Sequence, residues 1–267
     1  MQRALLNTVA PIIAGLVIAA SPVEAQTPEQ KGRAVAEEAD RQDFGWHDNA
    51  SIMRMVLRNR SGQESVRELR RRVLESTEKE RGDKSIIIFE SPRDIQGTAL
   101  LSHTRILEPD DQWLYLPALK RVKRISSGNK SGPFVGSEFA YEDLVSQEVD
   151  KYEYRWLRDE RCGDLECAVV ERYPRYENSG YTRQIVWWDK EEYRVQKIEY
   201  YDRKDTLLKT LTYHDYQEYN GEYWRPDRMA MVNHQNGKST DLVFEEWTFG
   251  AGVSDNEFTA SRLRRAR

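Results

Sequence analysis

Short runs of apolar and aromatic residues alternate with polar positions along most of the chain after residue 50. Turn residues separate many of these runs, and the pairs Asn220-Gly221 and Asn236-Gly237 are typical of tight β-hairpins. The pattern therefore predicts strands that follow one another mainly through hairpins. We expect strands at residues 51–59, 64–75, 84–90, 98–105, 111–116, 120–125, 151–158, 166–173, 182–188, 194–201, 207–216, 223–233 and 239–249.

A helical pattern occurs once, ahead of the strands, from Thr27 to Phe44. Val35, Ala36 and Ala39 form an apolar stripe there among Glu and Arg residues. No second long helical block follows. A dozen twisted strands cannot remain one flat sheet, so we predict a mainly β fold in which an antiparallel sheet curls into a barrel or half-barrel.

Residues 1–25 are typical of a cleavable signal peptide. Met1-Gln2-Arg3 is a short basic start, residues 4–20 are mostly apolar, and Val23-Glu24-Ala25 provides small residues before a cleavage site at Gln26. The alternative is an uncleaved membrane anchor, which the short apolar run and Pro11 disfavour. We therefore expect a periplasmic protein whose single domain covers residues 26–267.

The composition narrows the functional classes. Charged residues make up 32% of the 267 residues, yet the net charge is −4, and nucleic-acid binding needs a strong basic field. Cys162 and Cys167 flank a Gly-Asp turn, and an exported chain favours a disulfide between them. A redox or metal role is the alternative, although Cys-x4-Cys is not the usual Cys-x-x-Cys spacing.

Motifs of known catalytic sites are missing from the sequence. It has no Gly-x-Ser-x-Gly elbow, phosphate-binding loop, His-Glu-x-x-His motif or dinucleotide fingerprint, and its four histidines are widely separated. Carboxylate pairs such as Glu142-Asp143 and Glu245-Glu246 are plentiful and usually lie in solvated turns. We expect a non-enzymatic protein without cofactor or metal, with an envelope hydrolase as the weaker alternative.

Residues 111–144 combine an aromatic strand, a basic cluster, a Gly/Ser loop and an acidic-aromatic segment. The basic cluster has three interpretations: charge on an edge strand that prevents aggregation, a rim that binds an anionic head group or an acidic partner, or a nucleic-acid contact, which the export signal disfavours. The loop at 126–137 either covers a cavity mouth or cradles an anion with its glycines. We predict a lid over residues 126–144. The basic rim consists of Lys120, Arg121, Lys123 and Arg124.

Three blocks of this region resemble one bacterial family. Residues Phe89–Leu101, Asp111–Ile125 and Gly136–Asp143 are similar to outer-membrane lipoprotein-sorting proteins, which are relatives of the periplasmic lipoprotein carrier LolA. The resemblance implies a half-open antiparallel β-barrel with a helical lid, an apolar cavity for acyl chains, no cofactor, and an RND/MMPL-type exporter as partner. The strands here are more charged than those of the lipoprotein carrier, which leaves a simpler lipid open as cargo.

Alternation along the strands then predicts which residues line the cavity. We expect these inner-wall and lid residues to be Met53, Met55, Leu57, Leu69, Ile88, Leu100, Trp113, Tyr115, Phe139 and Tyr141. A shift of one residue would turn a whole strand to its other face. The alternative to a carrier is a structural or docking module of an envelope complex whose barrel core is filled.

Overall fold

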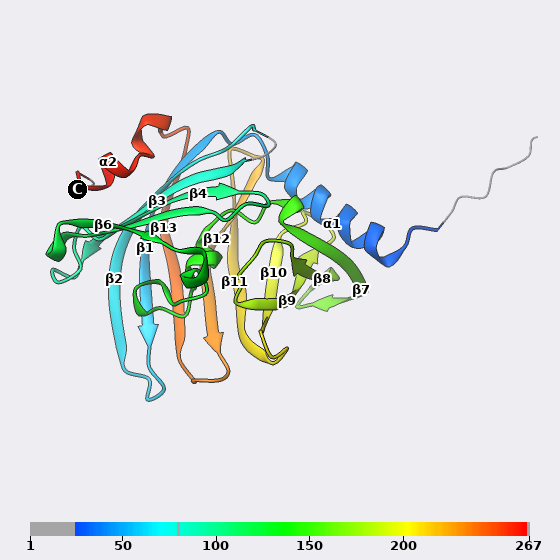
Figure 1. Cartoon of the computed structure of the whole chain (residues 1–267). Coiled ribbons are helices and arrows are strands. Elements are labelled where there is room, and N and C mark those ends of the chain that lie inside the picture. Colours follow the sequence, from blue (N-terminus) through cyan, green and yellow to red (C-terminus); the bar gives the residue numbers. More distant parts are fainter. Residues whose placement is uncertain (1–24, 79–80, 266–267) are drawn as a thin grey trace, which may run out of the picture.

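A computed structural model describes residues 25–78 and 81–265 (Figure 1). The predicted signal peptide lies outside this range, apart from its last residue. Each predicted strand is present, with ends shifted by a few residues at most. The helices and strands are α1 (Pro28–Gln42), β1 (Asp48–Arg58), β2 (Glu64–Leu74), β3 (Arg81–Ser91), β4 (Ala99–Arg105), β5 (Asp111–Leu116), β6 (Arg121–Ile125), β7 (Tyr152–Cys162), β8 (Leu165–Pro174), β9 (Tyr181–Asp189), β10 (Val195–Asp202), β11 (Leu207–Tyr219), β12 (Tyr223–Asn233), β13 (Ser239–Phe249) and α2 (Ala260–Leu263).

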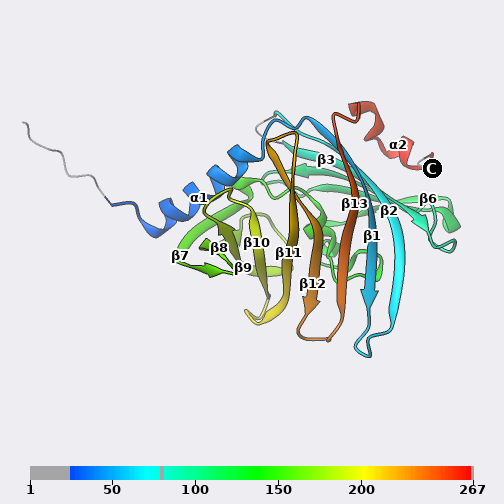
Figure 2. The same ribbon diagram turned by 180° about the vertical axis from the view of Figure 1, so that it is seen from behind.

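The strands of the described residues form one 13-stranded sheet in the order β6-β5-β4-β3-β2-β1-β13-β12-β11-β10-β9-β8-β7. Every pairing among the described strands is antiparallel, and among them only β1 and β13 are neighbours that lie far apart in sequence. The sheet curls without closing, so β6 and β7 are its free edges (Figures 1 and 2). The predicted half-open antiparallel barrel with an N-terminal helix is confirmed.

Helix α1 lies beside β7 at one end of the curled sheet (Figure 1). Thr27 caps it: the side chain of Thr27 accepts from the backbone N–H of Gln30, and the Gln30 side chain accepts from the Thr27 N–H. A Cβ at Gly32 would lie 2.7 Å from the backbone nitrogen of Trp156 on β7. The helix therefore approaches this strand more closely than any larger residue would permit.

The connection between β6 and β7, called here the β6–β7 segment (residues 126–151), consists of 3-10 turns rather than a long helix. The turns are Ser127–Asn129, Phe134–Gly136, Tyr141–Leu144 and Val149–Lys151. Phe134 and Phe139 are fully buried in the main core, where Phe134 contacts the rings of Phe89 and Tyr141. The segment thus packs into the hollow of the sheet.

Apolar side chains cover both faces of the sheet near β3 and β4. The main core lies on the concave face and includes Met55, Leu69, Leu100 and Leu211. A smaller core lies on the outer face, where the C-terminal residues Phe258 and Leu263 pack against Ile86, Ile88 and Leu101. Figure 1 shows this C-terminal tail in red beside β3 and β4.

Candidate functional site

A cavity of about 900 Å³ lies between α1, the concave face of the sheet and the end of the β6–β7 segment. This volume is near the upper end of the range for ligand-binding pockets, roughly 300–1,000 Å³. Its wall comes from strands β1–β3 and β7–β13, because the curled sheet directs alternate side chains inward. The cavity is therefore formed by most of the curled sheet together with the helix at its end.

Much of this wall is apolar and aromatic. Phe244 and Trp247 are stacked with their ring centroids 4.7 Å apart, and Tyr213 and Tyr216 are also stacked. Burial raises the pKa of both tyrosines above the usual range, so the hydroxyls stay neutral. The apolar and aromatic residues that line the cavity include Ala36, Met53, Ile87, Phe139, Trp188, Tyr213, Tyr216, Met229, Leu242, Phe244 and Trp247.

Arginines also reach into the cavity, and most of them have partners. Arg172 donates to the Gln184 side chain at 2.6 and 2.8 Å and lies over the Tyr152 ring. Arg194 pairs with the fully buried carboxylate of Asp189 at 2.8 Å. Arg225 pairs with Asp43 of the α1 end at 2.5 Å. Arg71 differs, since its guanidinium has no hydrogen bond or ion pair with another described residue.

Carboxylates gather where α1 meets the start of β3. Burial, together with the charge of Glu148, raises the pKa of Asp83 to about 7 and that of Asp40 to about 6. Both aspartates line the cavity, as do Glu75 and Glu148. This side of the cavity therefore changes its charge near neutral pH.

The predicted inner-wall residues fall into two groups. Seven belong to the main core of the concave face or pack against it, and of these Met53 and Phe139 line the cavity itself. These seven are Met53, Met55, Leu57, Leu69, Leu100, Phe139 and Tyr141. The placement of the other three, Ile88, Trp113 and Tyr115, was wrong, because they pack into the outer core with the C-terminal tail.

On β5 the side chains that point inward are not the predicted ones, and the contacts of Gln112 explain why. Gln112 and Leu114 point inward, and the Gln112 amide donates to Ser102 at 3.1 Å and to the backbone carbonyl of Tyr141 at 2.9 Å. A buried glutamine thus anchors the β6–β7 segment. The aromatic residues Trp113 and Tyr115 take the opposite face, where Trp113 meets His103 edge-on.

The predicted basic rim is not at the cavity. Lys120, Arg121, Lys123 and Arg124 are exposed, and none of them lines the cavity. They lie on and beside β6, which is an edge strand, and Arg124 pairs with Asp111. Their position fits the interpretation of charge that protects a sheet edge.

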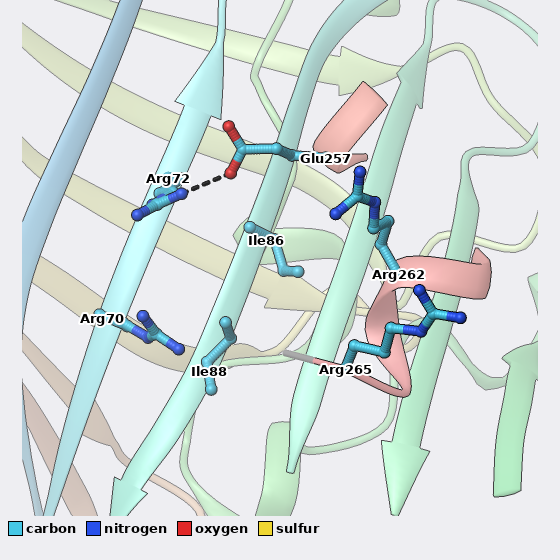
Figure 3. Close-up of a pocket in the computed structure, with 7 residues that line it drawn as sticks. All are labelled: Arg70, Arg72, Ile86, Ile88, Glu257, Arg262 and Arg265. Atoms are coloured by element: carbon cyan, nitrogen blue, oxygen red, sulfur yellow. Dashed lines mark hydrogen bonds and ion pairs between the residues drawn. The ribbon is translucent and has the colours of Figure 1, made fainter. Parts of the chain in front are cut away.

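A second, smaller groove of about 210 Å³ lies on the outer face (Figure 3). Ile86 and Ile88 form its floor. Arginines surround it, and two of them are neutralised: Arg72 by Glu257 and Arg70 by Glu90. Arg262 and Arg265 enter from the C-terminal tail, as Figure 3 shows.

The predicted disulfide between Cys162 and Cys167 is present, with the Cα atoms 5.9 Å apart. It joins the ends of β7 and β8 across their hairpin turn. The bridge lies outside the cavity wall. Its role here is therefore to hold the edge hairpin of the sheet.

Several cavity residues were missed by the sequence analysis. Trp188, Tyr213, Met229 and Phe244 belong to strands that were predicted correctly, and alternation along those strands would have found them. Arg71 lies within a run of three arginines, Arg70–Arg72, where charge gives no sign of which side chain points inward.

Comparison with known proteins agrees with this architecture. A family model described as an uncharacterized protein matches residues 81–265. No curated protein matches the chain. Within the described residues, no helix combines the length and apolar character needed to cross a membrane.

Three crystal structures are similar over most of their length. A domain described as an outer membrane lipoprotein-sorting protein from Vibrio parahaemolyticus is 50% identical, with a TM-score of 0.86, and the alignment covers 89% of this chain and 100% of that one. A DUF1329 family protein from Desulfovibrio piger is 28% identical, with a TM-score of 0.84 and the same coverage. A LolA superfamily protein from Nitrosomonas europaea shares the fold at 23% identity and a TM-score of 0.69, with 89% and 99% coverage. This chain therefore belongs to the family of outer-membrane lipoprotein-sorting proteins, and it has the fold of the LolA superfamily.

Proposed function

We propose that this protein is a periplasmic carrier that shelters the acyl chains of a lipid or lipoprotein in the cavity beneath α1. The observation that carries the proposal is the cavity itself, about 900 Å³ with a largely aromatic and aliphatic wall. Each CH₂ group that leaves water for such a wall contributes roughly 0.8 kcal/mol. Binding of this kind needs no catalytic group, and the proposed role is non-enzymatic.

The β6–β7 segment is the proposed gate. Its Phe139, Leu144 and Val149 form part of the cavity wall, so a shift of the segment changes the space open to a ligand. A carrier must release its cargo, which requires two states that differ in affinity. The proposed gate includes the residues predicted as a lid, 126–144, and its aromatic residues pack against the concave face.

Lipid extraction tests the carrier proposal. The protein is purified from the periplasm of its own host without detergent, extracted with organic solvent, and the extract is analysed by mass spectrometry. We expect a lipid or fatty acid in a fixed molar ratio to protein. Empty extracts, together with no binding of a fluorescent fatty acid to the purified protein, would rule the carrier role out.

The second candidate is a docking module of an envelope complex with a filled core. It is favoured by the depth to which Phe134 and Phe139 of the β6–β7 segment enter the main core. The size of the remaining cavity favours the carrier instead. The same extraction separates the two, because a filled module carries no lipid.

The proposal also includes a transport partner. We expect an RND/MMPL-type inner-membrane exporter to contact the exposed basic hairpin formed by β5 and β6. Photo-crosslinking from position 123 in living cells tests this, with position 164 on the opposite edge hairpin as the control. Crosslinks to such a transporter from position 123 alone support the partnership, whereas none from either position contradicts it.

A further inference from the structure

Three inner-face positions form a row across neighbouring strands. Ser51 on β1 is the direct antiparallel partner of Arg71 on β2 and of Trp247 on β13. Adjacent strands lie about 4.8 Å apart, so the three side chains stand next to one another on the same face. Arg71 and Trp247 line the cavity, as does Asn49, which precedes Ser51 on the inner face of β1.

The polar atoms of this row lack partners. Ser51 Oγ and Trp247 Nε1 are buried, and neither makes a hydrogen bond within the described residues. Ser51 as a whole is only 3% exposed. The guanidinium of Arg71 makes no such hydrogen bond either, and burial lowers its pKa to about 10. Unpaired buried donors are rare in folded proteins, because each forfeits a hydrogen bond to water. Two such atoms, beside a half-buried arginine that has no ion pair with another described residue, point to a partner from outside the chain.

The chemistry of these groups selects an anion. An arginine has only donors, an indole N–H can only donate, and a serine hydroxyl can donate. Two charges act on the pKa of Arg71: Asp83, which forms no ion pair with it, raises the pKa, and Arg225, a further positive charge, lowers it. Charge-assisted hydrogen bonds from arginine to a carboxylate or phosphate are among the strongest in proteins.

Apolar residues of the cavity wall lie directly beside this row. Met53 follows Ser51 along the inner face of β1, and Phe244 is stacked on Trp247. Leu242 continues the same wall along β13. A molecule held at the row therefore has an apolar surface directly beside it.

We propose that the Arg71–Ser51–Trp247 row binds the oxyanion head group of an amphiphile, a carboxylate or a phosphate, whose tail lies against Met53, Leu242 and Phe244. This inference rests on the proposed carrier function and deepens it. It assigns the cargo to anionic lipids and gives the cavity a polar end and an apolar end.

Calorimetric titration of the protein without its predicted signal peptide tests the assignment. The ligands are decanoate, decyl phosphate, the neutral monodecanoyl glycerol and inorganic phosphate. We expect both anionic ligands to bind at least ten-fold more tightly than the neutral one. Arg71→Gln should weaken the two anionic ligands about 10- to 100-fold and leave the neutral one unchanged. Trp247→Phe, which removes only the N–H donor, should weaken the same two ligands by a smaller factor.

The control is Arg54→Gln, since Arg54 lies on the outer face of β1, pairs with Glu245 and does not line the cavity. It should change none of the affinities. Equal affinities for anionic and neutral ligands in the parent protein would overturn the head-group assignment and leave the carrier function standing. An equal loss of affinity for all ligands in Arg71→Gln would also overturn the head-group assignment. Binding of inorganic phosphate as tight as that of decyl phosphate would do the same. No binding of any tailed ligand would overturn the carrier function as well.

Discussion

Lys209 of β11 donates to the Asp143 carboxylate at 2.6 Å, and both side chains are almost completely buried. The same ammonium donates to the backbone carbonyl of Glu138 at 2.9 Å. Asp143 also accepts from Tyr181 at 2.7 Å. One strand residue thus holds the middle of the β6–β7 segment against the concave face, and any opening of the gate must break this contact.

Replacement of Lys209 by methionine is expected to destabilise the protein by about 3 kcal/mol, because it leaves a buried carboxylate without its cation. Urea unfolding at neutral pH, followed by tryptophan fluorescence, measures the change. Adding Asp143→Asn to this variant should recover part of the loss. The control is Lys190→Met, which breaks an exposed pair with Asp159 and should cost less than about 1 kcal/mol. Equal losses for the two lysine variants would contradict the assigned role.

The contact between α1 and β7 depends on a single glycine. Gly32→Ala places a Cβ 2.7 Å from the Trp156 backbone, so the helix must move away from the sheet, at a cost of about 1–3 kcal/mol. Thermal unfolding should show a lower Tm, even though alanine favours helix formation. Gly128→Ala is the matched control, since no atom lies within 4 Å of its added Cβ. An unchanged or higher Tm for Gly32→Ala would show that the helix tolerates the shift.

Alternation and turn residues predicted all the strands, because each hairpin is a local feature of the chain. The face of the sheet to which each side chain points was harder to predict for strands whose two faces are both covered by other residues. The run Ile86–Phe89 is buried throughout, so β3 carries no contrast between an inner and an outer side chain. Residues Phe258 and Leu263 cover its outer face from the far end of the chain, which no local pattern reveals. Arg71 escaped notice for a similar reason, since its environment comes from Ser51 and Trp247 on other strands.

The raised pKa of Asp83 makes stability depend on pH. Its folded-state pKa is about 7 against an ordinary value of 3.8, so between these values the folded protein binds more protons than the unfolded chain. The free energy of unfolding should therefore fall as pH rises from 5 to 8. Asp83→Asn keeps an acceptor for the Ser76 N–H and removes the charge. We expect it to stabilise the protein at pH 8 by on the order of 1–2 kcal/mol and to have little effect at pH 5.

Urea unfolding at a series of pH values provides the measurement for this prediction. Asp164→Asn, in the exposed turn between β7 and β8, serves as the control and should leave the pH profile unchanged. A parent profile that rises between pH 5 and 8, with no difference in Asp83→Asn, would show that Asp83 is ionised without penalty in the folded state.

The two faces of β12 offer a direct test of where a lipid tail lies. Met229 lines the cavity, whereas Val232 on the same strand is 45% exposed on the other face. Met229→Trp adds bulk to the cavity and should weaken binding of a fluorescent fatty acid about ten-fold or more. Val232→Trp adds an indole of the same size outside the cavity and should leave the affinity unchanged. Because both variants introduce one tryptophan on one strand, a difference between them reports the place of binding. Equal affinities would move the tail away from this wall, and a loss confined to Val232→Trp would place it on the outer face.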